Sequence, residues 1–375
     1  MRNDLNRRPL SLLRFPVWIW GAAAFVLISC IHGHGENDSS PRSLSLGSHT
    51  RDVDIDDSFR LLSWNVKAGA LFPKSMPSPA GEEAGARVGR FERIMRAVRP
   101  DIVCLQEIWP KRGLDAVIEL LNRTLPLGTN RRWQVYRGAD VVIASPYALK
   151  MKTSELVIPH PLPEMPGFHY GQAMCLVDLP DDRFGQDLFV ITTHYRSRSG
   201  RENELKRERH SESILRALRD LRLPGGKVNL PTGTPVLIAG DFNVYESNED
   251  DPKRHLQMLI TGESEVDISG EFSPDWDETD LTDLLPSING RGREFYTWRN
   301  DRQPYPPGAL DRVLFTDSVL RPVSSFVLDT ASLEEEALAS FGLKADDCYF
   351  AGRKGEYDHL PIIVDFAIEN LVKTP

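Results

Sequence analysis

Residues 237–244 (LIAGDFNV) constrain the fold of this chain more than any other stretch, because an apolar run ends there in polar side chains. The run over residues 236–239 reads as a buried strand, and Asp241 and Asn243 follow it two positions apart. Residues two apart on a strand face the same side, so a carboxylate and a carboxamide would project together. Gly, Asp and Asn are also ordinary turn residues. Alone, the stretch supports a ligand site and a plain turn about equally.

Length and composition indicate a globular protein with a large core. The chain has 375 residues, of which 41% are hydrophobic and 26% charged, enough for one large domain or two ordinary ones. The formal net charge of -9 argues against a general nucleic-acid binder, since such proteins usually carry a basic surface. Only a local basic patch would make nucleic acid a plausible partner.

The first 30 residues predict an export signal. Four arginines precede an uncharged run over residues 15–29, which is too short for a comfortable membrane span. The run ends in Leu-Ile-Ser-Cys at Cys30, similar to the lipobox of bacterial lipoproteins, with a plain signal peptide or an uncleaved anchor as alternatives. We therefore expect an exported protein that is tethered to the cell envelope or secreted. Residues 31–58 read as a flexible tether.

The other cysteines do not suggest a metal site. Cys104, Cys175 and Cys348 are odd in number and lack metal-type spacing, so neither a disulfide framework nor zinc is expected. An acidic segment, residues 263–283, reads as a solvated loop, although its carboxylates would also suit calcium.

The rest of the chain alternates strand and helix patterns. Strands are expected near residues 59–66, 101–107, 133–136, 140–144, 154–158, 172–179, 187–193, 236–241, 295–299, 308–315 and 357–366. Helices are expected near residues 88–98, 114–122, 202–209, 250–262 and within 329–342. With neither an internal repeat nor a second core, residues 59–371 form one expected domain.

Polar residues recur where the expected strands end. These are Asn65, Glu107, His194, Asp241, Asn243, Asp311, Asp358 and His359. A lone histidine such as His194 is more often structural than catalytic, and Glu107 would also suit an exposed strand terminus. Eight such positions in order favour a common site. Arg196 and Arg198 stand beside His194, before the helix begins, and two guanidinium groups there suit a phosphate.

These stretches resemble the endonuclease/exonuclease/phosphatase superfamily, which includes DNase I-like nucleases, abasic-site endonucleases, sphingomyelinases and inositol polyphosphate phosphatases. The motifs SWNV, DIVCLQE, TTH, GDFN, LDRVLF and YDHLPI stand in that family's order. The run His194-Tyr195-Arg196-Ser197-Arg198 is similar to one in bacterial extracellular nucleases. One departure is Ser145-Pro146-Tyr147, where many members carry a Ser-Arg pair.

The resemblance implies an α+β fold, a four-layer α/β/β/α sandwich of two mixed sheets flanked by helices. It also implies a metal site of Asn65, Glu107 and Asp358 for Mg²⁺, with Mn²⁺ as the alternative. His359, oriented by Asp311, would act as a base or electrostatic partner, and His194 as a general acid or phosphate clamp. Asp241 and Asn243 would position water and phosphate, and Arg196, Arg198 and Asn243 would bind substrate.

The function that follows is that of an exported, divalent-metal-dependent phosphodiesterase, a hydrolase acting on nucleic acid in the manner of an endonuclease. The alternatives are a phospholipase C or sphingomyelinase-like enzyme, a hydrolase of small phosphate esters and a non-catalytic binding domain. Expected partners are the phosphodiester substrate and a membrane reached through the N-terminal signal or a lipid, with the protein itself monomeric.

Overall fold

The computed structural model describes residues 58–67, 71, 81–108, 114–151, 171–222, 229–244, 253–264, 272–302, 304–348 and 357–369. The chain divides into two units, Met1–Pro41 and Arg42–Pro375, and the first lies wholly outside the described residues. The expected export signal, Cys30, the tether up to residue 57 and the expected strand at 154–158 also lie outside them. The domain boundaries therefore stay a prediction.

The described strands form two mixed sheets. The first contains β1 (Ser58–Asn65), β2 (Ile102–Gln106), β3 (Gln134–Arg137), β4 (Val141–Ser145), β11 (Leu320–Val327) and β12 (Ile362–Ile368), in the order β11-β12-β1-β2-β4-β3. The second contains β5 (Ala148–Lys150), β6 (Gly171–Asp178), β7 (Leu188–His194), β8 (Val236–Asp241), β9 (Thr282–Leu284) and β10 (Asp311–Phe315), in the order β5-β6-β7-β8-β10-β9.

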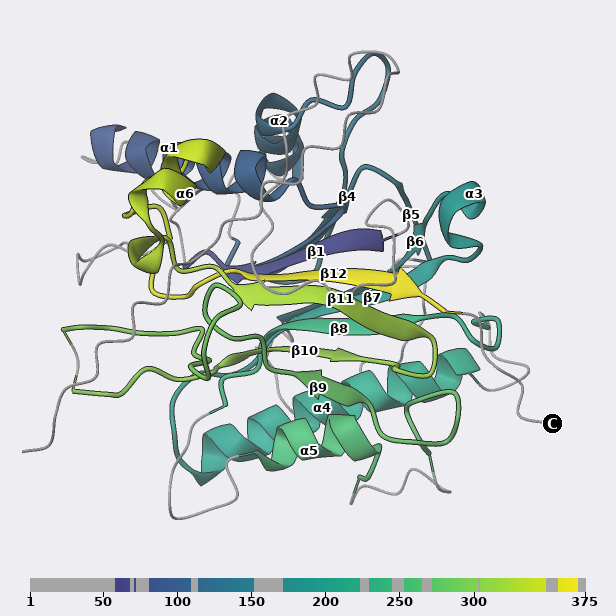
Figure 1. Cartoon of the computed structure of the whole chain (residues 1–375). Coiled ribbons are helices and arrows are strands. Elements are labelled where there is room, and N and C mark those ends of the chain that lie inside the picture. Colours follow the sequence, from purple (N-terminus) through teal and green to yellow (C-terminus); the bar gives the residue numbers. More distant parts are fainter. Residues whose placement is uncertain are drawn as a thin grey trace, which may run out of the picture. The chain divides into compact units, whose positions relative to one another are not determined.

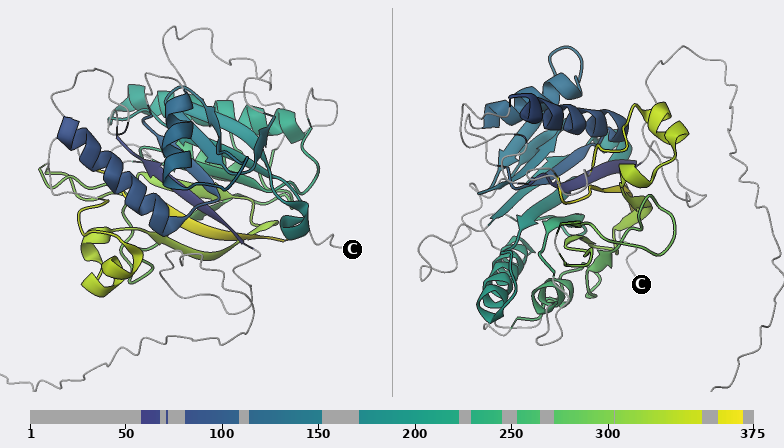
Figure 2. Two further views of the ribbon diagram at one scale, coloured as in Figure 1. Left: turned by 90° about the horizontal axis from the view of Figure 1, so that it is seen from above. Right: turned by 90° about the vertical axis from the view of Figure 1, so that its left-hand side faces the viewer.

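Helices cover the outer face of each sheet (Figures 1 and 2). On the first sheet lie α1 (Gly81–Val98), α2 (Leu114–Thr124) and α6 (Glu335–Phe341); on the second lie α4 (Arg201–Arg222) and α5 (Arg254–Thr261). Two short helices, α3 (Asp181–Phe184) and the 3₁₀ turn η2 (Thr330–Ser332), are the remaining elements of the described residues. The predicted α/β/β/α sandwich is confirmed.

Strand β8 shows how the sheets come to be packed on both faces, because its successive side chains belong to two different cores. Leu237 and Ala239 belong to the core between the two sheets, whereas Val236 and Ile238 belong to the core beneath α4. Successive side chains of a strand point to opposite faces, so this wholly apolar run can be buried on both sides.

Close approach of two strands explains the glycine at the end of that run. Gly240 has a φ of 156°, and a Cβ built on it would lie 2.0 Å from the carbonyl oxygen of Thr193 on β7. Only glycine fits there, next to Asp241.

Two expectations need correction. Residues 295–299 form no strand; Trp298 instead makes isolated bridges to Gly308 and His359, and β10 begins only at Asp311. Strand β11 was not expected, because Pro322 interrupts its pattern. It is tolerated because β11 is an edge strand with an irregularity between Pro322 and Ser324.

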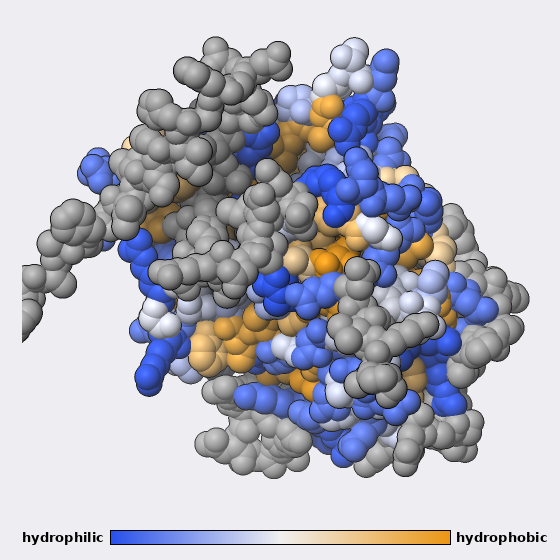
Figure 3. Space-filling view, turned by 45° about the vertical axis from the view of Figure 1, so that its right-hand side comes forward, coloured by the Kyte–Doolittle hydropathy of each residue, from blue (hydrophilic) through white to orange (hydrophobic). Residues whose placement is uncertain are grey.

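None of the helices within the described ranges combines the length and hydrophobicity that crossing a bilayer requires. The face drawn in Figure 3 shows hydrophilic residues with smaller hydrophobic areas between them.

Candidate active site

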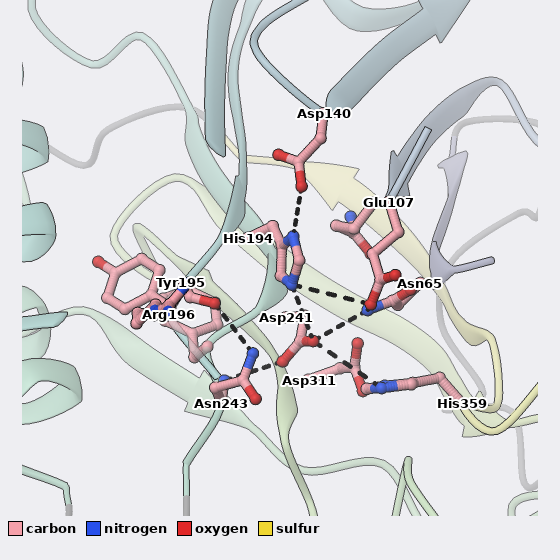
Figure 4. Close-up of polar contacts among 12 residues, drawn as sticks. Asn65, Glu107, Asp140, His194, Tyr195, Arg196, Asp241, Asn243, Asp311 and His359 are labelled. Atoms are coloured by element: carbon pink, nitrogen blue, oxygen red, sulfur yellow. Dashed lines mark hydrogen bonds and ion pairs between the residues drawn. The ribbon is translucent and has the colours of Figure 1, made fainter. Parts of the chain in front are cut away.

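Asp241 lies at the centre of a polar cluster where several strands end (Figure 4). The strand register brings the parts together, since Asp241 on β8 pairs with His194 on β7 and with Asp311 on β10. Its Oδ2 accepts a hydrogen bond from Asn65 Nδ2 at 2.9 Å, and its Oδ1 accepts one from the backbone N–H of Asn243 at 2.8 Å. The carboxylate is 2% exposed, so these donors replace the water it has lost.

Both histidines approach the same oxygen of this carboxylate. His194 Nε2 lies 3.7 Å from Asp241 Oδ2, and His359 Nε2 lies 3.8 Å from it. Each imidazole has its other nitrogen on a second carboxylate. His194 Nδ1 is 2.7 Å from Asp140 Oδ2, and His359 Nδ1 is 2.8 Å from Asp311 Oδ2. These contacts fix the orientation of both rings.

The surrounding charge perturbs all three central groups. Burial alone would lower the pKa of His194, but the hydrogen bond to Asp140 and the charge of Asp241 raise it to about 9. Burial likewise opposes the charges of Asp311 and Asp241, which raise the pKa of His359 to about 10. Burial raises the pKa of Asp241 to about 6 despite the nearby His359. At neutral pH two imidazolium groups thus flank one ionised carboxylate.

Glu107 joins the cluster from the end of β2. Its φ of 58° lies in the left-handed region, which turns its side chain where the strand stops. Glu107 Oε1 accepts a hydrogen bond from Asn65 Nδ2 at 3.1 Å and lies 4.0 Å from His194 Nε2. Asn65 therefore bridges Glu107 and Asp241, while its Oδ1 accepts from the backbone N–H of Lys67.

Asp358 stands at the edge of this group, in an ion pair with Lys67. Lys67 Nζ lies 2.6 Å from Asp358 Oδ2, and both side chains are partly exposed. The neighbouring His359 is held through its backbone, since Trp64 Nε1 donates to the His359 carbonyl oxygen at 2.9 Å. The assignment of Asp358 to the metal stays a prediction.

The predicted phosphate-binding arginines lie on the loop that follows His194. Arg196 and Arg198 are exposed, and Arg196 Nε donates to Asn203 on α4. Beneath them the buried Arg207 donates through Nη1 to the carbonyl oxygens of Arg196 and Arg198, at 2.6 and 3.0 Å. Arg207 thereby holds the loop in place beside the histidine.

Asn243 stands beside Asp241 in the left-handed region, with a φ of 48°. Its Nδ2 donates to the carbonyl oxygen of Tyr195 at 3.0 Å. The side chain thus connects the loop after β7 to the end of β8.

The cluster fits a divalent cation by charge and by its donor atoms. Five carboxylates (Glu107, Asp140, Asp241, Asp311 and Asp358) face three cationic groups (His194, His359 and Lys67), which leaves two negative charges in excess. Asp311 Oδ1 is buried without a hydrogen-bond partner. Oxygen ligands suit a hard cation such as Mg²⁺.

Two groups of side chains compete as ligands. Potential ligand atoms of Asp241, Asp311 and His359 lie within 4.8 Å of one another. His359 has both ring nitrogens directed at carboxylates, with Nδ1 2.8 Å from Asp311 Oδ2 and Nε2 3.8 Å from Asp241 Oδ2. Glu107, beside Asn65, offers a carboxylate outside both histidine–carboxylate pairs.

The structure brings the predicted cluster residues together but adds others that the sequence did not reveal. The sequence indicates Asp140 only as the start of an expected strand. Gly171 gives it room, because a Cβ there would lie 2.6 Å from Asp140 Oδ1. Arg207 belongs to the helix expected at residues 202–209, where nothing in the sequence marks it as buried, yet it is fully buried. Lys67 carried no signal beyond its place two residues after Asn65.

Comparison with known proteins gives one family match. A model of the Endonuclease/Exonuclease/phosphatase family matches residues 62–333. A search of curated proteins finds no match. Among solved structures, the human Nocturnin catalytic domain with a bound sulfate anion is similar at 16% identity, covering 84% of this chain and 97% of its own, with a TM-score of 0.48.

Two further solved structures are similar to the same extent. TDP2 from D. rerio, complexed with a single-strand DNA product, has 17% identity, covers 83% of this chain and 99% of its own, and has a TM-score of 0.49. A beta toxin from Staphylococcus aureus has 16% identity, covers 82% and 99%, and has a TM-score of 0.46.

Proposed function

Because this chain belongs to the endonuclease/exonuclease/phosphatase family, we propose that it is a divalent-metal-dependent phosphodiesterase whose main substrate is nucleic acid. One observation carries the proposal: two histidine–carboxylate pairs converge on a single oxygen of Asp241. A phosphodiester is anionic and resists attack, so its hydrolysis requires charge neutralisation, an oriented water and a proton for the leaving oxygen. The cluster offers a group for each requirement.

In this proposal Glu107, with Asn65 beside it and Asp358 at the edge, holds Mg²⁺ or Mn²⁺. The bound ion supplies charge neutralisation and polarisation of the phosphoryl oxygens. The excess of two negative charges supports a divalent ion here.

The remaining steps belong to the side chains around Asp241. Its pKa of about 6 suits a group that orients a water and accepts its proton near neutral pH. His194 has the more exposed imidazole, at 17% against 7% for His359, and donates the proton to the leaving oxygen. His359, held by Asp311, stays charged and stabilises the phosphate. Arg196 and Arg198 extend the contact to neighbouring phosphates.

A substrate panel tests the function. The protein without residues 1–30 is incubated with plasmid DNA, RNA, sphingomyelin and bis-p-nitrophenyl phosphate, each with Mg²⁺, Mn²⁺, Ca²⁺ or EDTA. We expect nucleic-acid cleavage that EDTA abolishes. Release of choline phosphate without DNA cleavage would establish the phospholipase C alternative. Absence of any turnover would favour a binding domain.

We also propose that residues 1–30 export the protein and that Cys30 carries a lipid. The basic start, the short apolar run and the Leu-Ile-Ser-Cys sequence support this. A palmitate analogue should label the wild-type chain in cells but not Cys30→Ala. An unlabelled wild type would leave a plain signal or an anchor.

A further inference from the structure

Residues 291–302, 304 and 305, here called the arginine–aromatic loop, carry an unusual surface beside the site. Phe295 and Tyr305 are 49% and 64% exposed, more than Leu205 and Leu285 at 36% and 39%, the other large hydrophobic side chains exposed among the described residues. About half of Phe295 and more than half of Tyr305 is open to solvent, so each ring offers apolar surface to a ligand.

Arginines alternate with these rings. Arg291, Arg293 and Arg302 are exposed, and within the described part of the chain none of them has an ion pair. Arg299 alone is neutralised, by Asp301 at 3.0 Å. The loop contains four arginines, one glutamate and one aspartate, a local excess of two positive charges in a chain of net charge -9.

The base of the loop is joined directly to catalytic residues. Trp298 forms bridges with both Gly308 and His359, and the backbone N–H of Arg299 donates to the Asp358 carbonyl oxygen at 3.1 Å. Thr297 Oγ1 accepts from the backbone N–H of Asp311 at 2.9 Å. The loop extends from this attachment on the left of Figure 1, drawn in green.

Chain length limits how far the rings lie from the reaction. Phe295 is three residues from Trp298, which bridges to His359, so it lies at most about 11 Å along the chain from that bridge. Tyr305 is three residues from Gly308, so it lies at most about 11 Å along the chain from the second bridge, between Gly308 and Trp298. A base one or two nucleotides from the scissile phosphate would lie within reach of such a ring.

We propose that the arginine–aromatic loop binds single-stranded nucleic acid, stacking bases on Phe295 and Tyr305 and contacting phosphates through Arg291 and Arg293. The inference rests on the proposed function and specifies its substrate. Stacking requires a base with a free face, which a single strand offers and a paired duplex does not, and it is tolerant of sequence. A membrane-inserting loop would place its apolar residues together, whereas here Arg299, Asp301 and Arg302 lie between Phe295 and Tyr305.

Binding measured without turnover tests the surface. The full chain in EDTA is titrated into a fluorescent oligothymidine and into a duplex of equal length, and anisotropy is recorded. We expect tighter binding to the single strand. The double variant Phe295→Ala/Tyr305→Ala should weaken single-strand binding on the order of 10-fold or more and leave duplex binding unchanged. Arg291→Gln/Arg293→Gln should lower the slope of log affinity against log salt by about 1.4.

Matched variants separate the surface from general effects. Leu205→Ala removes an exposed apolar side chain elsewhere, and Arg131→Gln/Arg132→Gln removes two exposed arginines elsewhere; both should bind like the wild type. Hydrolysis of bis-p-nitrophenyl phosphate should survive the loop substitutions, because the loop side chains lie outside the catalytic cluster. The EDTA assay stays informative even if no ester is hydrolysed, so failure of the proposed function is recognised separately.

Three results would overturn the proposal. The first is that Phe295→Ala/Tyr305→Ala binds the single strand as tightly as the wild type does. The second is that this variant loses single-strand and duplex affinity equally. The third is that, in a parallel titration with phosphatidylglycerol vesicles, it loses affinity for the vesicles alone, which would identify the loop as a membrane contact.

Discussion

The two histidine–carboxylate pairs of the cluster are alike in geometry and different in surroundings. His194 and His359 approach Asp241 Oδ2 at 3.7 and 3.8 Å, and each has a carboxylate on its Nδ1. The pair on His359 is enclosed, with side chains 7% and 2% exposed, whereas the pair on His194 is more open, at 17% and 11%. The difference suggests a division of work: an enclosed charge suits electrostatic stabilisation, and an open one suits exchange of a proton.

The shared carboxylate is where the largest effect is expected. Asp241→Asn keeps the shape of the side chain but removes the charge that both imidazoles face. We expect kcat/KM for a phosphodiester to fall by about 10³-fold, within the range for lost acid–base catalysis. In metal-free protein the pKa of both histidines should fall together, as ¹⁵N NMR titration would record. A fall for only one histidine would show that the convergence on Asp241 is not functional.

Replacing the carboxylates on the histidine Nδ1 atoms, Asp311 and Asp140, one at a time compares the two pairs directly. We expect Asp311→Asn to reduce kcat/KM by about 10²-fold to 10³-fold, because His359 lies where water cannot replace its partner. Asp140→Asn should cost about 10-fold to 10²-fold, since the more open site admits water as a substitute. Steady-state kinetics on both variants would check the order. Equal losses would contradict the assigned difference in surroundings.

Much of the enclosed pair could be predicted from sequence, because its signals are local. Asp311 and His359 each stand next to an apolar strand, and the same holds for His194 and Asp241. Asp140 also stands next to an apolar strand, over residues 141–144, but nothing in the sequence pairs it with His194. Its contact with His194 joins the residue before β4 in one sheet to the end of β7 in the other, 54 residues apart, and depends on how the two sheets stack.

For the fold, too, local sequence signals were predictive and long-range pairing was not. Strands with long apolar runs were predicted, whereas β11 was missed because Pro322 interrupts its pattern. The sequence also predicts a strand at residues 295–299, yet only Trp298 forms bridges there. The local sequence pattern indicates which segments can form a strand, but a strand forms only where a neighbouring segment is placed to hydrogen-bond with it.

Mg²⁺ should act on both histidines by the same electrostatic route. In EDTA we expect pKa values of about 9 for His194 and about 10 for His359, both above the usual 6.5. A cation at Glu107 would weaken the negative field, so both pKa values should fall when Mg²⁺ is added, and that of His194 should fall more because Glu107 lies 4.0 Å from it. NMR titration with and without Mg²⁺ measures this.

The same raised pKa values imply a pH dependence of stability in metal-free protein. Groups whose pKa is raised on folding stabilise fully below the unfolded value of 6.5, and this contribution is lost as pH rises through 9 to 10. The free energy of unfolding in urea should therefore decline over that range, and less steeply in His359→Gln. A variant with unchanged pH dependence would contradict the assignment.

The smallest effect is expected from a substitution that disturbs only the His194–Asp140 pair. In Gly171→Ala the new Cβ would lie 2.6 Å from Asp140 Oδ1 and 2.7 Å from the His194 carbonyl oxygen, so Asp140 should move away from the imidazole. We expect kcat/KM to fall about 10-fold and the pKa of His194 to move toward 6.5, because its strongest hydrogen bond is weakened.

His359 serves as the internal control for this variant. Gly171 lies on β6 and pairs with His194 on β7, whereas Asp311 lies on β10 and His359 precedes β12. The pKa of His359 should stay near 10. Gly89→Ala provides a matched glycine substitution, because its Cβ would meet only Arg93, at an ordinary 3.5 Å. If the pKa values of both histidines shifted in Gly171→Ala, the two pairs would be coupled through the backbone of the strands. The charge of Asp241 would then not be what links them.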